Sequence, residues 1–190
     1  MNSSLSFLSE SSVVAAPKLL GCILERQLGD ETLRVRIVET EAYDQTDVAS
    51  HSYNGETPRT SVMFGEPGHL YVYFTYGMHY CCNVVTSPKG HGAAVLIRAV
   101  EPLDGGATMA ELRGHKSGVE LTNGPAKTCQ ALMIDKALNG HNLADSPLIL
   151  SAGSLKKDEA IVQTTRIGLS KGTDMPWRFY IKDNPYVSKK

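Results

Sequence analysis

The chain of 190 residues lacks the features that mark several large classes of protein. No apolar run approaches the roughly 18 residues that a membrane-spanning helix requires. The N-terminus has no basic segment before an apolar stretch, and Ser and Glu interrupt its hydrophobic residues, so we expect no secretory signal peptide. These absences predict a cytoplasmic protein that does not enter a membrane.

Cysteine is scarce, and its spacing indicates no special chemistry. The four thiols, at positions Cys22, Cys81, Cys82 and Cys129, form no CxxC pair and are too few for a disulfide scaffold. No group of His, Cys, Asp and Glu has metal-ligand spacing. No Gly-rich phosphate loop, GxSxG turn or nucleotide-binding fingerprint is present either. The sequence therefore predicts buried thiols, no metal and no cofactor.

A strong charge of either sign is also absent. The formal net charge is -1, which gives no overall attraction to nucleic acid. The two halves differ, however: residues 1–104 carry seven Lys/Arg against twelve Asp/Glu, and residues 105–190 carry twelve against eight. A locally basic face and a scatter of solvated charges both remain open.

Aromatic residues are few, but they are concentrated in one place. The composition gives eight Tyr, four Phe and one Trp, and five of these thirteen lie within the ten residues 71–80, YVYFTYGMHY. Such a stretch is typical either of a packed core or of a surface that stacks on flat ligands. The rest of the chain has to distinguish the two.

The pattern along the chain predicts a single α+β domain over residues 1–190, with a curved, largely antiparallel sheet, flanking helices and a protruding β-hairpin. Gly29 and Asp30 separate two alternating strands, 22–28 and 32–43, and strands are also expected at 69–76, 81–86, 92–100 and 176–181. Helices are expected at 9–20, 105–114 and 124–134. Residues 44–68 read as a long loop, which inside a compact domain is often functional.

Two carboxylates in the stretch VETEAY share one face of the predicted strand. Glu39 and Glu41 are two residues apart, so their side chains point to the same side of the sheet. One interpretation is a solvated face at a sheet edge. The other is a general base at a strand end, a role that contributes roughly 10²–10⁴ in rate. The stretch alone does not decide between them.

The aromatic stretch follows the same two-residue period. Tyr71 and Tyr73 share one face, whereas Phe74 is expected to face the core. Tyr76 lies at the mouth of a turn predicted at Gly77-Met78 and is expected to project outward, as a wedge that enters a base stack does. The alternative is that Tyr76 folds back onto its own sheet.

Two polar residues interrupt apolar strands. Arg98 lies within AAVLIRAV and Asn83 within CCNVV, and a buried guanidinium is expensive unless it is paired or reaches a wet pocket. Each can be a satisfied polar group of the core or a ligand contact. His51 and His69 lie in or beside the long loop, and their spacing assigns them no role.

Taken in order and spacing, these segments resemble the alkyladenine (3-methyladenine) DNA glycosylase family in its short bacterial form. The resemblance runs from the first predicted helix to NPYVS near the C-terminus. Its most specific pieces are VETEAY, ASH, TPRTSVMFGEPGHLYVYFTYGMHYCCNVV, LIRAVEP, NGPAKTCQAL and RIGLSKGTDMPWRFY.

The resemblance implies roles for the residues at the matching positions. Glu41 is expected to activate the attacking water, and Arg98 to help hold that water beside the sugar. Tyr43, His51 and Tyr73 are expected to enclose the extruded base. The two tyrosine rings would stack on the base, and the histidine would hydrogen-bond to its edge.

Further positions follow in the same way. Tyr71 is implied as a supporting neighbour of the base pocket, and Asn83 as the residue that disfavours the exocyclic amino group of normal guanine. Tyr76 is implied to fill the gap that the extruded base leaves in the duplex, with Met78 probing beside it.

The activity that the resemblance implies is monofunctional removal of alkylated purines from double-stranded DNA by a monomer, without cofactor. The expected substrates are 3-methyladenine and 7-methylguanine, with hypoxanthine and ethenoadenine as further candidates. Two alternatives stay open: a non-catalytic protein that binds lesions or nucleic acid, and a nucleoside hydrolase that uses Glu39 and Glu41 as an acid/base pair.

Overall fold

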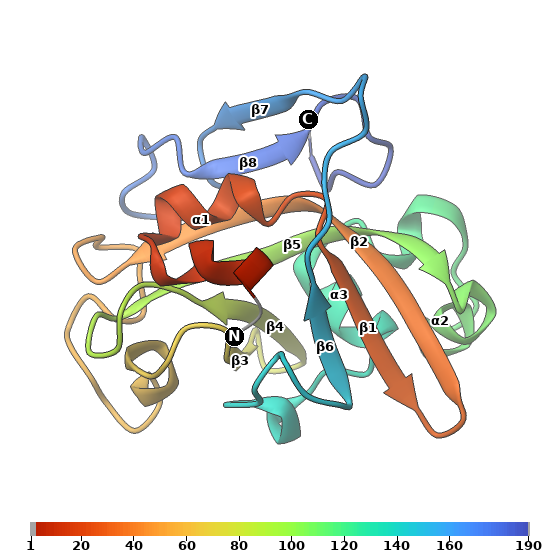
Figure 1. Cartoon of the computed structure of the whole chain (residues 1–190), viewed down its shortest axis with the longest axis horizontal. Helices are drawn as coiled ribbons and strands as arrows, with labels where there is room; N and C mark the ends of the chain where they lie inside the picture. Colours follow the sequence, from red (N-terminus) through yellow and green to blue (C-terminus); the bar gives the residue numbers. More distant parts are fainter. Residues whose placement is uncertain (1–2, 190) are drawn as a thin grey trace.

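A curled antiparallel sheet forms the framework of the computed structural model, which describes residues 3–189 (Figure 1). Within those residues the sheet has eight strands: β1 (Ile23–Leu28), β2 (Glu31–Asp44), β3 (Leu70–Thr75), β4 (His79–Val85), β5 (Ala93–Asp104), β6 (Leu148–Ser151), β7 (Ile161–Thr164) and β8 (Arg178–Ile181). The strand order is β3-β4-β5-β2-β1-β6, and β8 pairs with both β2 and β7.

The length of β2 explains this branching. Its first part, residues 31–36, pairs with β1, and residues 39–41 pair with β8, while β5 runs along the other side. The segment that carries Glu39 and Glu41 therefore lies inside the sheet, between β5 and β8. The interpretation of these carboxylates as a solvated sheet edge is wrong.

Short helices cover the sheet. They are the 3₁₀ helix η1 (Ser3–Ser9), α1 (Ser12–Lys18), η2 (Ser61–Phe64), α2 (Gly106–Leu112), η3 (Gly118–Leu121), α3 (Pro125–Ala131) and η4 (Lys136–Leu138). The first α-helix begins three residues later than predicted because Ser11 has an extended backbone, with φ -56° and ψ 152°. Pro17 lies inside the last turn of α1.

The hydrophobic core lies on one face of the sheet. Leu24, Ile37 and Ile97 from the central strands are fully buried there, and they belong to the same cluster as Ala16 of α1 and Ala131 of α3. Because side chains alternate along a strand, the opposite face of β2, β3, β4 and β5 remains for the polar and aromatic residues. That face carries the candidate site.

The α+β fold with a curved antiparallel sheet is confirmed. The hairpins β1–β2 and β3–β4 lie where the alternation predicted them, and residues 45–69 form the expected long connection, with only η2 inside it. The strands β6 and β7 were not predicted, since each has only four residues and a weak alternation. The second hairpin turn is centred on Tyr76 and Gly77, not on Gly77-Met78, because both have positive φ, 51° and 66°.

Candidate active site

A cavity of about 110 Å³ opens on the sheet face opposite the core. Three strands and two connecting segments supply its walls: Tyr43, Ala49, His51, Met63, Tyr71, Tyr73, Asn83 and Leu169. Five of these eight are the residues that the resemblance assigned to a base pocket. The fold therefore brings together side chains that are up to 126 positions apart in the sequence.

Aromatic rings and a histidine form one side of this cavity. The rings of Tyr71 and Tyr73 stack with centroids 5.8 Å apart, and the His51 ring stands edge-on to Tyr73 at 4.6 Å. His51 Nδ1 lies 3.0 Å from the Tyr71 hydroxyl, and Asn83 Nδ2 donates to the Tyr71 carbonyl at 3.1 Å. Tyr71 is buried, and its hydroxyl is hydrogen-bonded to His51.

Tyr43 links the cavity to Glu41. Its hydroxyl donates a hydrogen bond of 2.9 Å to Glu41 Oε2. The Arg166 guanidinium carbon lies 4.7 Å from the centre of the Tyr43 ring, a cation–π contact that fixes the ring from outside the cavity. The ring is thus held in place both at its hydroxyl and over its face.

Glu41 is fully buried, although it was expected to meet solvent. Its Oε1 accepts the backbone N–H of Ile167 at 2.9 Å and lies 3.3 Å from Arg98 Nη1, while Oε2 accepts the Tyr43 hydroxyl. The carboxylate lies one hydrogen bond behind the cavity wall rather than in it.

Arg98 faces both carboxylates because of a bulge in β5. The pairing of β2 with β5 shifts register on either side of Glu39 and passes from Ile97 directly to Ala99. Bulges of this kind re-aim a side chain. The guanidinium lies 3.4 Å from Glu39 and 3.3 Å from Glu41, so it is a paired cation rather than an isolated buried charge.

Glu39 differs from Glu41 in having a saturated set of partners that does not touch the cavity. Its Oε1 accepts Arg178 Nη1 at 2.7 Å, and its Oε2 accepts the backbone N–H of Ser188 at 2.7 Å. Glu39 is absent from the cavity lining. This arrangement counts against Glu39 as the acid of an acid/base pair.

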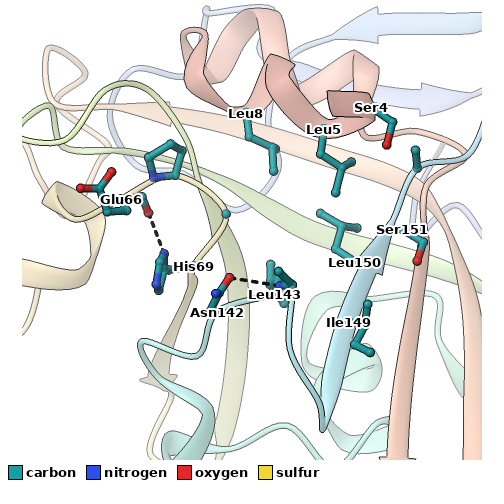
Figure 2. Close-up of a pocket in the computed structure, with 14 residues that line it drawn as sticks. Ser4, Leu5, Leu8, Glu66, His69, Asn142, Leu143, Ile149, Leu150 and Ser151 are labelled. Carbon is teal, nitrogen blue, oxygen red and sulfur yellow. Dashed lines mark hydrogen bonds between the residues drawn. The ribbon is translucent and has the colours of Figure 1, made fainter. Parts of the chain in front are cut away.

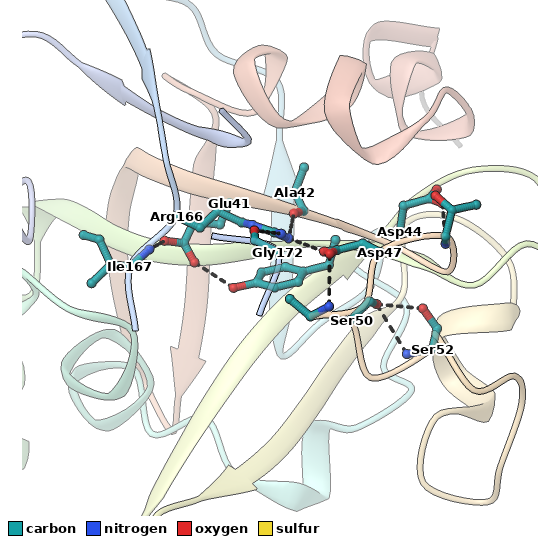
Figure 3. Close-up of polar contacts among 12 residues, drawn as sticks. Glu41, Ala42, Asp44, Asp47, Ser50, Ser52, Arg166, Ile167 and Gly172 are labelled. Atoms are coloured by element: carbon teal, nitrogen blue, oxygen red, sulfur yellow. Dashed lines mark hydrogen bonds and ion pairs between the residues drawn. The ribbon is translucent and has the colours of Figure 1, made fainter. Parts of the chain in front are cut away.

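Arg166 was not singled out from the sequence. Figure 3 shows the Arg166 guanidinium beside the Ala42 carbonyl, the Asp47 carboxylate and the Gly172 carbonyl. Its buried charge pairs with Asp47. This ion pair anchors the loop that carries His51, because Asp47 also accepts the backbone N–H of Ala49 in that loop. RIGLSKGTDMPWRFY contributed to the resemblance as a whole, but no spacing indicates a partner 119 positions away.

Burial dominates the acid–base properties of the cavity. Burial raises the pKa of the Tyr43 and Tyr73 hydroxyls, and the charge of Glu41 is a smaller cause at Tyr43. Burial also raises the pKa of the Cys81 thiol to about 11. The pKa of His51 is lowered, first by burial and then by the charge of Arg59. The cavity is therefore lined by neutral rings at neutral pH.

The tip of the β3–β4 hairpin is the opposite of this buried site. Tyr76 is 83% exposed and Met78 is 70% exposed, so Tyr76 projects outward and does not fold back. The prediction that Phe74 faces the core is wrong, since Phe74 is 51% exposed and contacts Tyr80 at 5.0 Å between ring centres. At this point the hairpin extends past the core, so both of its faces meet solvent.

A larger cavity of about 550 Å³ lies elsewhere, and Figure 2 shows its lining. Leu5, Leu8 and Leu150 form an apolar side, while Glu66 and His69 lie at a polar end. It shares no lining residue with the smaller cavity. Of the two histidines beside the long loop, only His51 thus belongs to the candidate site.

Neither a metal cluster nor a membrane span is found in the part of the chain that the structure describes. Within residues 3–189, no three His, Cys, Asp or Glu side chains are grouped so that they could hold a metal ion. None of the helices there has the length and apolar character needed to cross a bilayer. All four cysteines are buried and free.

Comparison with known proteins shows the family of the chain. Residues 6–185 match the sequence model of the family described as Methylpurine-DNA glycosylase (MPG). A relative from Carboxydothermus hydrogenoformans is 52% identical over 97% of each chain, and one from Francisella tularensis subsp. tularensis is 49% identical over the full length of both. Both carry the name "Putative 3-methyladenine DNA glycosylase". The chain therefore belongs to the methylpurine-DNA glycosylase family and is a hydrolase of the DNA N-glycosylase type.

Proposed function

We propose that this chain removes 3-methyladenine and 7-methylguanine from double-stranded DNA by simple hydrolysis of the N-glycosidic bond, leaving an abasic site. The supporting observation is the cavity lined by Tyr43, His51 and Tyr73, with the Glu41 carboxylate directly behind the Tyr43 hydroxyl. One copy of the chain supplies every residue of this site, so we propose that it acts as a monomer on DNA in the bacterial cytoplasm.

The cavity explains how a single base is held. Extruding a nucleotide from a duplex costs a few kcal/mol, and less when the base is damaged. An aromatic face contributes roughly 1–3 kcal/mol per stacked base, so the rings of Tyr43 and Tyr73 can offset that cost. Asn83 lines the cavity, which supports the proposal that it disfavours the exocyclic amino group of guanine.

In the proposed reaction, the oxygen of a water molecule bonds to the anomeric carbon as the bond from that carbon to the base breaks. The bonding electrons leave with the base, and Glu41 accepts a proton from the water. Arg98, 3.3 Å from Glu41, helps to hold the water. The negative charge of Glu41 also stabilises the positive charge that develops on the sugar.

Alkylated and neutral bases place different demands on this site. 3-Methyladenine and 7-methylguanine are cationic in DNA and leave as neutral bases without a further proton. Hypoxanthine and ethenoadenine also require a proton donor, so we expect slower release. Among the described residues, the cavity lining includes no lysine, which supports hydrolysis without strand cleavage.

The test is single-turnover base release from duplexes that each carry one of these lesions. We expect Glu41→Gln to lower the rate by roughly 10²–10⁴ while binding of the lesion duplex persists, because a general base acts on the chemical step. Glu25→Gln is the matched control, because Glu25 on β1 is partly exposed and pairs with Arg34 on β2, and it should release base at the wild-type rate. Unchanged release by Glu41→Gln would remove Glu41 from the mechanism, and lesion binding without release by the wild type would contradict the proposal.

A further inference from the structure

The C-terminal segment hydrogen-bonds to the buried ionic cluster that contains Glu39 and Arg98, and it lines no part of the cavity. Val187 is buried, with 6% of its surface exposed, and this anchors the residues that follow it. The Ser188 backbone N–H donates to Glu39 Oε2 at 2.7 Å, and the Lys189 carbonyl accepts Arg178 Nη1 at 2.9 Å. Two successive residues of the tail thus hydrogen-bond to the buried ionic cluster.

Ser188 also contacts Arg98 itself. Arg98 Nε donates to Ser188 Oγ at 3.1 Å, and the same nitrogen lies 3.4 Å from Glu39 Oε1. On the other side of the guanidinium, Nη1 lies 3.3 Å from Glu41. One edge of Arg98 is therefore held by Ser188 and Glu39, and this directs the other edge toward Glu41.

Charge balance explains why this support matters. Arg98 lies between two buried carboxylates and would be drawn toward whichever is less well neutralised. Arg178 and the Ser188 N–H occupy both oxygens of Glu39, so Glu39 attracts Arg98 less strongly than a bare carboxylate would. The guanidinium can then remain within 3.3 Å of Glu41.

From these contacts we propose that Ser188 is a positioning residue, which holds Arg98 against Glu41 through its hydroxyl and shields Glu39 through its backbone N–H. This inference rests on the proposed function of Glu41 and Arg98. It assigns a part in the chemical step to a tail residue 147 positions from Glu41 that lines no part of the cavity.

The experiment compares Ser188→Ala with Ser188→Thr in single-turnover release of 3-methyladenine over a range of enzyme concentrations. This yields two quantities: the maximal rate, and the half-saturation, which is the enzyme concentration that gives half of that rate. We expect Ser188→Ala to lower the maximal rate roughly tenfold, the equivalent of one hydrogen bond to a charged group, with half-saturation unchanged. Ser188→Thr keeps the hydroxyl and should restore most of the rate. Ser154→Ala, an exposed serine outside this cluster, should behave as wild type.

Three results would overturn the proposal. They are a wild-type maximal rate for Ser188→Ala, equal losses for the Ala and Thr variants, or a change confined to half-saturation. A chain that ends at Val187 provides a second measure, because it lacks all three tail hydrogen bonds and should lose at least as much rate as Ser188→Ala. Glu41→Gln, run in parallel, separates the two levels: if it retains full activity the proposed function fails, and if it is inactive while Ser188→Ala is not, only the role of Ser188 fails.

Discussion

The centre of β2 and the tip of the β3–β4 hairpin carry the two halves of the proposed activity, and they are built in opposite ways. At the centre, Glu41 is buried and accepts the backbone N–H of Ile167, and the neighbouring Arg166, which is also buried, donates to the Ala42 carbonyl of β2. At the tip, Tyr76 and Met78 are apolar and exposed, and a local turn alone presents them.

Because of this difference, a substitution should have different energetic consequences in the two regions. A buried charge depends on every partner that it has, so a change at one residue is felt by the whole cluster. An exposed side chain at a turn has few partners in the free protein and is expected to contribute through DNA. Substitutions at the centre should therefore affect folding or chemistry, and substitutions at the tip should affect binding.

The strongest test of this contrast is Arg166→Met, which keeps much of the side-chain volume and removes the charge. Asp47 would remain buried without its partner, so we expect a loss of about 3–5 kcal/mol in the free energy of unfolding, measured with urea. Arg34→Met is the control, because Arg34 pairs with Glu25 and Asp104 at the surface, where ion pairs contribute little. Equal losses of unfolding free energy in the two variants would show that the buried ion pair contributes no more to stability than the surface pair.

At the tip, we expect Tyr76→Ser to weaken binding of lesion-containing duplex about 5- to 150-fold, the range that corresponds to one stacked aromatic side chain. Its urea midpoint should match that of the wild type, because the ring is 83% exposed. Tyr53→Ser, at a 48% exposed tyrosine outside the hairpin, is the control for loss of an exposed aromatic. Undiminished affinity in Tyr76→Ser would count against the wedge.

The smallest effect is expected at Arg59, where the cavity meets solvent. Arg59→Met should raise the pKa of His51 toward its ordinary value, although burial, the larger cause, still holds it lower. The measurement is an NMR titration of the His51 ring in the two proteins. A pKa of His51 that is unchanged in the variant would exclude Arg59 as a cause.

The sign of the pH dependence follows from the direction of this shift. Since the pKa of His51 is lower in the folded protein, the unfolded chain takes up a proton first as pH falls below about 6.5. The stability that neutral His51 contributes is present above that pH and is lost as pH falls toward the folded pKa. Arg59→Met should lose less stability between pH 7 and pH 5.5.

Local patterns were sufficient for much of the fold and for part of the site. Alternation predicted both hairpins and placed Glu39 and Glu41 on one face, because a strand fixes the direction of each side chain. The outward direction of Tyr76 followed from its place at a turn. The membership of Tyr43, His51 and Tyr73 in one cavity came from the resemblance, not from spacing.

The same patterns failed where burial depends on distant segments. Alternation predicted a buried Phe74, which is exposed because the hairpin extends past the core. Local sequence also allowed a solvated Glu41, which is buried because the backbone of Ile167 covers it from 126 positions away. No pattern within a strand carries information about what packs against its face.

The sequence by itself determined which side chains share a strand face, where the chain turns, and that no long apolar helix or metal-ligand spacing is present, since these depend on neighbouring residues. Only the tertiary structure decided that Glu41 is enclosed, that Arg166 braces Tyr43, and that the tail residue Ser188 reaches Arg98. The physical reason is that burial and charge pairing are properties of surfaces in contact, and those surfaces come from opposite ends of the chain.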